Sequence, residues 1–248
     1  MKILLTNDDG IEAPGLTALA EILKDEECLI VAPTHERSAS SHSISLGQKL
    51  LLEARGPFRY AVNGTPADCV KLALSELRNF TPDLLISGIN PGPNTGVSVY
   101  YSGTISAARE ALINQIPAMA ISIGNKTPDD FSYAAQFTRK LLEGYETGVF
   151  PKNVLLNVNI PALPESEIRG IRIARQAPSR FVEEFIRESE SDGQRIYRLA
   201  GEIQVFEPDG TTDQEVLSQG FISITPLQLD QTDYSAFSRL EQWFQKNS

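Results

Sequence analysis

Hydrophobic positions along the chain form two kinds of pattern, short apolar runs and helix-spaced repeats. Short apolar runs that read as strands occur at residues 2–6, 28–32, 84–87, 118–123 and 154–160. Runs without polar alternation are typical of parallel strands that are covered on both faces. Between the first two runs, Leu16, Leu19, Ala20 and Leu23 repeat at the spacing of one helix face. Strand, helix and strand within 32 residues predict a right-handed βαβ unit, and hence an α/β fold with a mostly parallel sheet flanked by helices.

Two further helices carry signals at their first residues. Thr65 is an expected N-cap, with Pro66 at the first helical position and Asp68 closing a capping box. This gives Asp68 a structural explanation. Ser102 is an expected N-cap of a second helix, whose apolar face includes Ile105. Between the early strands and these helices, residues 44–52 and 58–62 are interpreted as irregular strands of a hairpin.

The pattern changes after Pro161, which suggests two parts, a core over 1–175 and an extension over 176–248. The segment 181–193 is charged and poorly periodic, whereas 195–199 and 203–206 are expected to form a hairpin. Residues 220–226 read as a clean returning strand. The chain then closes with a helix that carries Phe237, Leu240 and Phe244. We expect this extension to be used in subunit contact.

Composition narrows the class of protein. The chain has 248 residues, 41% of them hydrophobic, which suits a globular protein with a sizeable core. Its net charge of −10 argues against duplex nucleic acid as a partner, because a polyanion requires a basic face. No apolar run approaches the length of a membrane span, so no membrane partner is expected. Two cysteines are too few for a disulfide framework, so the expected location is the cytoplasm.

Polar segments follow three of the expected strands. Asp8 and Asp9 follow the first strand, the serine-rich segment 34–43 follows the second, and Asn90 opens a loop after the third. The carboxyl ends of parallel strands meet at one edge of an open sheet, where ligands bind. The candidate ligands are all oxygens, which favours a hard cation such as Mg²⁺, Mn²⁺ or Ca²⁺ over zinc. An Asp-Asp-Gly sequence is also typical of a solvated turn, and a serine-rich segment of a plain loop.

Two glycine-containing segments suggest how an anion is held. The loop 88–96 matches neither GxxxxGK[ST] nor GxGxxG, which removes the main support for an ATPase or a dinucleotide-binding protein. It offers the carboxamides of Asn90 and Asn94 on a rigid backbone. The sequence Ser102-Gly103-Thr104 lies at a helix N-terminus, where free N–H groups suit an oxyanion. Plain helix capping explains the same residues equally well.

Several motifs occur in order along the chain: TNDDG (6–10), APTHERSASSHSI (32–44), NGTPADCVKLA (63–73), SGINPGPNTG (87–96), YSGTISAAREA (101–111) and GFISITPL (220–227). In this order they resemble the SurE family of stationary-phase acid phosphatases and 5′(3′)-nucleotidases. Together they span nearly the whole chain. The family commonly has Gly or Thr where this chain has Ser40 and Ser41, and this difference leaves the expected site unchanged.

The resemblance implies a Rossmann-like α/β core that binds one divalent cation per subunit, Mg²⁺ or Mn²⁺. By motif position it implies four metal ligands, Asp8, Asp9, Ser38 and Asn90. It also implies hydrolysis of nucleoside monophosphates, as 5′- and in some cases 3′-esters, with polyphosphate as a further substrate in some members. Members form homodimers or homotetramers in which C-terminal elements exchange between subunits, which would suit the extension after residue 176.

The resulting hypothesis is metal-assisted hydrolysis of a phosphomonoester. Asn94 and the segment Ser102-Gly103-Thr104 would hold the phosphate oxygens and stabilise charge as it develops. Asp8 or Asp9 is the candidate acceptor of the water's proton. His42 is the candidate acid for the leaving group and a further candidate contact of the phosphate. Two other hypotheses remain open. One is a metal-dependent nucleotide-binding module or glycosyltransferase, and the other is a non-catalytic oligomerisation protein whose Asp-Asp-Gly is only a turn.

Overall fold

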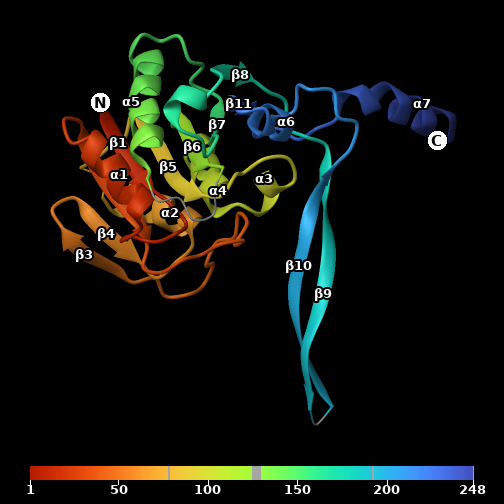
Figure 1. Ribbon diagram of the computed structural model, residues 1–248, viewed down its shortest axis with the longest axis horizontal. Coiled ribbons are helices and arrows are strands. Elements are labelled where there is room, and N and C mark those ends of the chain that lie inside the picture. Colours follow the sequence, from red (N-terminus) through yellow and green to blue (C-terminus); the bar gives the residue numbers. More distant parts are fainter. Residues whose placement is uncertain (78, 125–129, 192, 248) are drawn as a thin grey trace.

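A mixed sheet forms the centre of the molecule, in a computed structural model that describes residues 1–77, 79–124, 130–191 and 193–247. Within these residues the sheet has nine strands in the order β3-β4-β2-β1-β5-β6-β7-β11-β8 (Figure 1). Their bounds are β1 Lys2–Thr6, β2 Glu27–Pro33, β3 Leu52–Gly56, β4 Arg59–Val62, β5 Leu84–Pro91, β6 Ala118–Ile123, β7 Leu155–Ile160, β8 Ile171–Ile173 and β11 Ile222–Leu227.

The central strands are parallel, as the apolar runs predict. β1 pairs with both β2 and β5 in parallel register, and β5, β6 and β7 continue the parallel series. Within this sheet, antiparallel pairs among the described strands occur only towards its margins, where β3 pairs with β4 and β11 pairs with β7. Because the strand order reverses on either side of β1, the carboxyl end of β1 lies at the topological switch point where α/β sheets bind ligands.

Helices cover both faces of the sheet. They are α1 Pro14–Ile22, α2 Pro66–Glu76, α3 Ser98–Tyr101, α4 Gly103–Ile113, α5 Ser132–Glu146, α6 Asp213–Ser218 and α7 Phe237–Asn247, with short 3-10 turns at Glu165–Glu167 and Tyr234–Ala236. Leucines of α1 and α5 pack in one buried cluster on one face. Apolar residues of α2 and α4 pack in a second cluster on the other face. The expected Rossmann-like layering is therefore confirmed.

Both expected helix caps are present. The Thr65 hydroxyl accepts a hydrogen bond from the backbone N–H of Asp68, and the Asp68 carboxylate accepts one from Thr65 in return. The Ser102 hydroxyl accepts one from the backbone N–H of Ile105, which places the start of α4 at Gly103. The two helices begin where the sequence predicts because these caps satisfy otherwise free N–H groups.

The first expected hairpin begins later than predicted. Residues 44–51 form no strand, because Ile44 and Leu46 are exposed and gain no burial from pairing. The backbone N–H and hydroxyl of Ser45 instead donate to the Asp68 carboxylate at the start of α2. Only the second half of the prediction is correct, since β3 and β4 form the antiparallel pair.

A C-terminal hairpin is present, as expected, but its two strands are not the predicted ones. Residues 195–199 and 203–206 do not pair with each other, because 195–199 and 203–205 both belong to β10 (Gln194–Val205). β10 pairs with β9 (Ser179–Ser191), which contains most of the charged and poorly periodic segment 181–193. This ribbon has no buried face, so apolar alternation was not required. Gly201 lies within β10 so close to Val182 that a Cβ at Gly201 would stand 2.1 Å from the Val182 carbonyl oxygen.

The extension projects from the main body. In Figure 1 the β9–β10 ribbon runs away from the sheet, and α7 lies apart from it near the C-terminus. β11 returns to the sheet between β7 and β8, as the clean returning strand predicts. The division at residue 175 stays a prediction. Among the described residues, no helix is both long and apolar enough to cross a bilayer.

Candidate active site

A tight turn places two carboxylates at the carboxyl end of β1. The carboxamide of Asn7 donates to the carbonyl oxygen of Gly10 at 3.0 Å and accepts from the Gly10 N–H at 3.2 Å. Gly10 has a φ of 111°, which only glycine adopts without strain. Asp8 and Asp9 lie inside this braced turn, so both side chains can face one cavity rather than opposite sides of a strand.

That cavity has a volume of about 520 Å³ and brings together most of the predicted site. It is lined by Asp8, Asp9, Glu36, Ser38, Ala39, Asn90, Pro91, Asn94, Ser98, Tyr101 and Ser102. These residues come from the loops after β1 and β2, from the end of β5 and the loop after it, and from α3 and the cap of α4, as the common sheet edge predicts. Three of them are acidic, and none of the described lining residues is Lys or Arg. The cavity is therefore strongly electronegative.

Asp8 is held rigidly at the start of α4. Its carboxylate is only 4% exposed and accepts a hydrogen bond of 2.5 Å from the Thr104 hydroxyl. A side chain at Gly103 would collide with it, because a Cβ there would lie 2.6 Å from the Cβ of Asp8. Burial raises the pKa of Asp8 above its ordinary value, although hydrogen bonding to Thr104 opposes the rise. A cation beside this carboxylate would offset the cost of its burial.

Asp9 has an unmet requirement for a partner. Its Oδ2 atom is buried and has no hydrogen-bond partner in the described structure. Burial, together with the charges of Asp8 and Glu36, raises the pKa of Asp9 to about 7. A buried carboxylate without a partner is costly, and a bound cation is the usual compensation.

The segment after β2 contributes Ser38 and also Glu36, which the sequence reasoning missed. The backbone N–H of Arg37 donates to the carbonyl oxygen of Asp8 at 2.7 Å, which ties this segment to the Asp8-Asp9 turn. The Ser38 hydroxyl donates to the Glu36 carboxylate at 2.5 Å. Its oxygen lone pairs therefore stay available to a cation. The sequence signal for Glu36 was its position two residues before Ser38.

The two asparagines of the β5–α3 loop are oriented by different contacts. The Asn90 side-chain amide donates to the carbonyl oxygen of Gly92 at 2.6 Å, so its amide oxygen is the end left for a ligand. The Asn94 side-chain amide donates to Ser122 at 2.9 Å. Its second N–H can still donate into the cavity that Asn94 lines.

Two asparagines on β7 hold Asn94 in place, and no function was predicted for them. Asn159 accepts from the Asn94 backbone N–H at 2.7 Å, and Asn157 donates to the Asn94 carbonyl oxygen at 2.8 Å. Both carboxamides are fully buried. Their sequence signal was two asparagines inside an otherwise apolar strand, where polar side chains need buried partners.

Three predicted residues lie outside the cavity lining. The Thr104 hydroxyl serves Asp8, and Gly103 provides room for that carboxylate. His42 pairs with Glu110 at 2.9 Å, and Glu110 also binds Lys71 at 2.8 Å. The predicted phosphate contacts of these three residues, and the acid role of His42, stay predictions.

The donor set suits a hard divalent cation. In the part of the chain that the structure describes, no three His, Cys, Asp or Glu side chains converge as a metal-binding cluster. Two carboxylates with the neutral oxygens of Ser38 and Asn90 are the alternative, and such all-oxygen sets suit Mg²⁺ or Mn²⁺.

Comparisons with known proteins agree with one another. Residues 3–183 match the family model described as Survival protein SurE. A protein named 5′-nucleotidase SurE from Desulfatibacillum aliphaticivorans is 45% identical, with 98% of each chain covered. Its namesake from Syntrophus aciditrophicus (strain SB) is 46% identical, over 100% of this chain and 96% of that one. The crystal structure of the SurE protein from Aquifex aeolicus matches with a TM-score of 0.85 at 35% identity, covering 97% of this chain and 98% of that one.

Proposed function

The chain belongs to the SurE family, and on that premise we propose that it is a divalent-metal-dependent 5′-nucleotidase. The reaction is hydrolysis of a nucleoside monophosphate to nucleoside and phosphate. Curated relatives that share 40–46% of their residues with this chain over almost its full length carry the name 5′-nucleotidase. The site that would perform the reaction is the cavity at the carboxyl ends of β1, β2 and β5.

One observation carries the metal dependence. The cavity is lined by Asp8, Asp9 and Glu36 without a described basic residue, so a phosphate dianion would be repelled from it. A divalent cation reverses that local field and provides the partner that Asp9 lacks. An enzyme for a phosphate ester therefore requires a cation here, whereas a binding site for a neutral ligand does not.

The residues that would hold the cation are Asp8, Asp9, Ser38 and Asn90. When bound, a divalent ion polarises a phosphoryl oxygen and lowers the pKa of a water molecule. The chain keeps these four groups in place through the Asn7–Gly10 turn, the Thr104 hydroxyl, the Glu36 carboxylate beside Ser38 and the Gly92 carbonyl oxygen. Such braced ligands lose little entropy on binding.

Asn94 and Ser102 are proposed to bind the phosphate group. The Ser102 oxygen accepts from the Ile105 N–H, so its hydroxyl hydrogen is free to donate to a phosphate oxygen. The second N–H of the Asn94 amide can donate in the same way. The start of α4 adds the positive end of a helix dipole on this side. These donors would stabilise the charge that grows on the phosphoryl oxygens during reaction.

His42 remains the proposed acid for the leaving oxygen. In the structure its imidazole contacts Glu110 and does not line the cavity. A change in its χ1 and χ2 angles would be needed for the acid function. His42→Asn tests this: the loss of activity should be larger for an alkyl phosphate, whose leaving group needs a proton, than for p-nitrophenyl phosphate.

The main test is a phosphatase assay with purified protein. We expect release of phosphate from 5′-nucleoside monophosphates and p-nitrophenyl phosphate with Mn²⁺ or Mg²⁺, and its loss in EDTA. An Asp8→Asn variant should lose both turnover and bound metal. Full activity in the chelator would exclude the metal-dependent reaction.

The same site is proposed to accept 3′-nucleotides and short polyphosphate chains more slowly. The cavity is open to solvent beside the exposed Tyr101, so a chain longer than one phosphate can extend outwards. A panel of 5′-esters, 3′-esters and polyphosphates, each measured as kcat/KM, ranks these substrates. Equal rates for 5′- and 3′-esters would remove the proposed preference.

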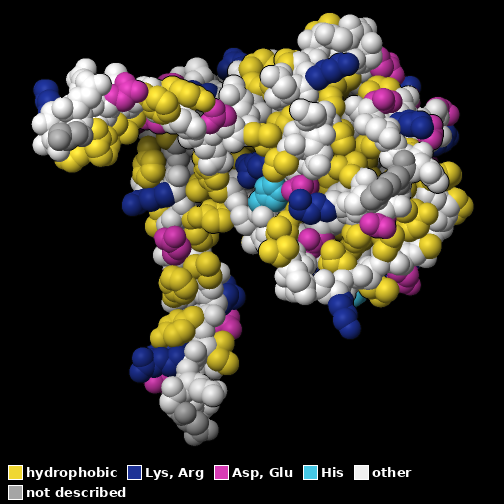
Figure 2. All heavy atoms as spheres, turned by 180° about the vertical axis from the view of Figure 1, so that it is seen from behind, with side chains coloured by type: hydrophobic (Ala, Val, Ile, Leu, Met, Phe, Trp, Pro, Cys, Tyr) yellow, Lys and Arg dark blue, Asp and Glu magenta, His cyan; other side chains and the backbone are white. Residues whose placement is uncertain are grey.

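The protein is further proposed to act as a homodimer or homotetramer in the cytoplasm. Large apolar side chains are exposed on the β9–β10 ribbon and on α7, which lie away from the main body (Figures 1 and 2). Exposed apolar patches of this kind are typical of subunit interfaces. Cys28 and Cys69 are free thiols, which suits a reducing compartment.

A further inference from the structure

The loop between β5 and α3 is held at Gly96 and Val97 by the base of the projecting ribbon. We use this name for three residues of the extension: Gln176, Ser179 at the start of β9, and Asp213 in α6. The backbone N–H of Gly96 donates to the Asp213 carboxylate at 2.9 Å. The side-chain amide of Gln176 donates to the Gly96 carbonyl oxygen at 2.8 Å. The next backbone N–H, that of Val97, donates to the Ser179 hydroxyl at 2.8 Å. Both polar groups of the Gly96 backbone are therefore held by the extension.

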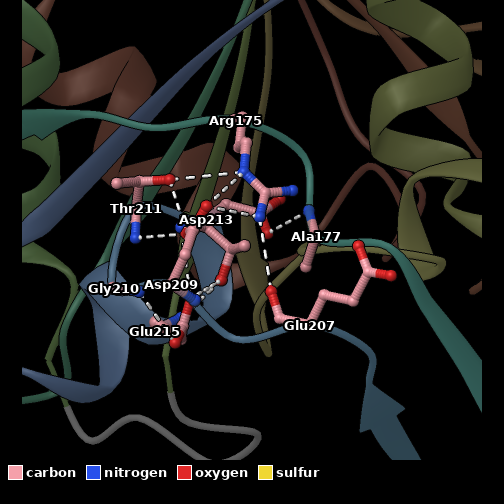
Figure 3. A network of polar contacts seen from close by, with 9 residues as sticks. Arg175, Ala177, Glu207, Asp209, Gly210, Thr211, Asp213 and Glu215 are labelled. Carbon is pink, nitrogen blue, oxygen red and sulfur yellow. Dashed lines mark hydrogen bonds and ion pairs between the residues drawn. The ribbon is translucent and has the colours of Figure 1, made fainter.

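Asp213 is built for this contact. Its side chain is fully buried and accepts three backbone N–H groups, from Gly96, Ala177 and Gln214. Its contact with Ala177 is visible in Figure 3. The cap of α6 does not need this carboxylate, because Thr212 and Glu215 already form the capping box there. The carboxylate is thus available to bridge the loop and the segment that leads into β9.

The packing around Gly96 leaves no space for a side chain at this position. Gly96 has a φ of 53°, and a Cβ there would lie 2.3 Å from the Ser179 hydroxyl. β9 begins at Ser179. The projecting ribbon is therefore joined to the β5–α3 loop by direct contact at its first residue.

The gripped segment belongs to the wall of the cavity. Asn94 lies two positions before Gly96 and Ser98 two positions after it, and both line the cavity. The Asn94 end of the loop is fixed from the sheet by Asn157 and Asn159. The Gly96 end is fixed by the extension, and its one other backbone contact among the described residues is local, from the Val99 N–H to the Gly96 carbonyl oxygen at 3.3 Å. Loss of the second anchor would leave Asn94 held at one end.

We propose that Asp213, assisted by Gln176 and Ser179, is a positioning residue for the phosphate-binding loop. The proposal rests on the proposed function, since it gives Asn94 a phosphate to hold. It extends the site to residues of the C-terminal extension, which makes the base of the ribbon part of the active-site scaffold. A displacement of about 1 Å in a group that contacts the transition state can reduce a rate 100-fold.

The test compares Asp213→Asn with Asp209→Asn. In Asp213→Asn the new side-chain amide keeps one oxygen, which can still accept from the N–H groups of Ala177 and Gln214. Its NH₂ group replaces the oxygen that accepted from the Gly96 N–H, so the loop contact is lost selectively. Asp209 is a matched control, because it binds Arg175 and Thr211 in the same network without touching the loop (Figure 3). Gln176→Leu is a second variant that removes the contact with the Gly96 carbonyl oxygen.

Three quantities separate positioning from folding. In Asp213→Asn we expect kcat/KM for a 5′-nucleoside monophosphate to fall about 10- to 100-fold, mainly in kcat. The Kd for Mn²⁺ should stay native, because its proposed ligands lie elsewhere in the cavity. Amide exchange at residues 94–98 should speed up in Asp213→Asn and stay native in Asp209→Asn. Gln176→Leu should show a smaller loss of kcat/KM in the same direction.

Each outcome decides the proposal. Native kcat in folded Asp213→Asn and Gln176→Leu would overturn it while leaving the nucleotidase function in place. An equal loss in Asp209→Asn would also overturn it, because the effect would then come from the network as a whole. If Asp213→Asn fails to fold, Gln176→Leu alone decides the outcome. A wild-type protein without phosphatase activity would overturn the proposed function and this inference together.

Discussion

The cavity at the sheet edge and the C-terminal extension differ in which groups lack a partner: buried polar atoms in the cavity, and exposed apolar side chains on the extension. At the cavity, polar atoms are buried without partners, as the Oδ2 atom of Asp9 shows. On the extension, apolar side chains are exposed without cover, with Trp243 at 59% and Phe185 at 66% of full exposure. A buried charge is satisfied by an ion, whereas an exposed apolar face is satisfied by another protein surface.

This contrast predicts an ion as the ligand of the cavity and a protein surface as the partner of the extension. The cavity is closely braced by hydrogen bonds from several elements, so its shape is set before any ligand arrives. The ribbon and α7 have few contacts with the main body, so we expect their exposed apolar side chains to pack against a second subunit. The two regions meet at Gly96, where the extension holds the cavity loop. The molecule is therefore expected to show strong effects of charge at one end and of burial at the other.

The largest effect on activity is expected at Asp9, whose carboxylate has one buried oxygen without a partner. Asp9→Asn should lower kcat/KM by at least about 100-fold, because even outer partners of metal ligands are worth 10- to 100-fold. The same change should raise Tm in EDTA, since it removes a buried charge beside Asp8 and Glu36. Metal titration and thermal unfolding measure the two effects. Glu12→Gln, at an exposed site nearby, should change neither. A native Mn²⁺ affinity in Asp9→Asn would contradict this division.

The next largest effect should be on self-association through α7, where large apolar side chains are exposed. Trp243→Glu should weaken self-association by more than about tenfold, because a buried aromatic anchor is worth about 2 kcal/mol or more. Sedimentation velocity over a range of protein concentrations measures the change. Gln242→Glu adds the same charge at the neighbouring exposed position and should leave assembly unchanged. A wild-type protein that is monomeric at high concentration would remove the contrast between the two regions.

A smaller effect is expected from the buried asparagines behind the cavity. Asn159→Leu should lower the free energy of unfolding by about 1–3 kcal/mol, since it leaves the Asn94 N–H buried without an acceptor. It should also lower kcat/KM, because Asn94 loses its anchor. Urea unfolding measures the first effect. Thr225→Val is the control on the adjacent strand: its hydroxyl is buried without a partner, so its removal should cost little.

The smallest effect concerns pH and the Glu110 cluster. Burial alone would raise the pKa of Glu110, but hydrogen bonds from His42 and Lys71 hold it below its ordinary value. A lowered folded pKa stabilises the protein above the unfolded pKa, about 4.3, and this contribution is lost as pH falls through the folded value. The stability difference between the wild type and Glu110→Gln should therefore be full at neutral pH and shrink in acid. A difference that grows in acid would contradict the sign, and Glu143→Gln on an exposed face serves as control.

Much of the fold was predictable because its signals are local. The strand over Lys2–Thr6 and the strand over Ala118–Ile123 have the expected bounds, and both helix caps lie where the side chains predict. The β9–β10 ribbon was not predictable in the same way. Its two strands bury little surface on pairing, so their sequence shows no regular spacing of apolar residues. They are held together by backbone hydrogen bonds, which nearly any sequence can form and which therefore leave no signal in the sequence.

The sequence by itself determined the sheet, its edge and the oxygen chemistry of the cavity. Apolar runs and the polar residues that follow them are neighbours along the chain, so these features can be read without a structure. Only the tertiary structure decided which oxygens are engaged: Thr104 with Asp8, Glu36 with Ser38, and Asn159 with Asn94. It also decided that Asp213 holds Gly96 from 117 positions away. Contacts of that range depend on how whole elements pack, because no local pattern specifies which distant groups will meet.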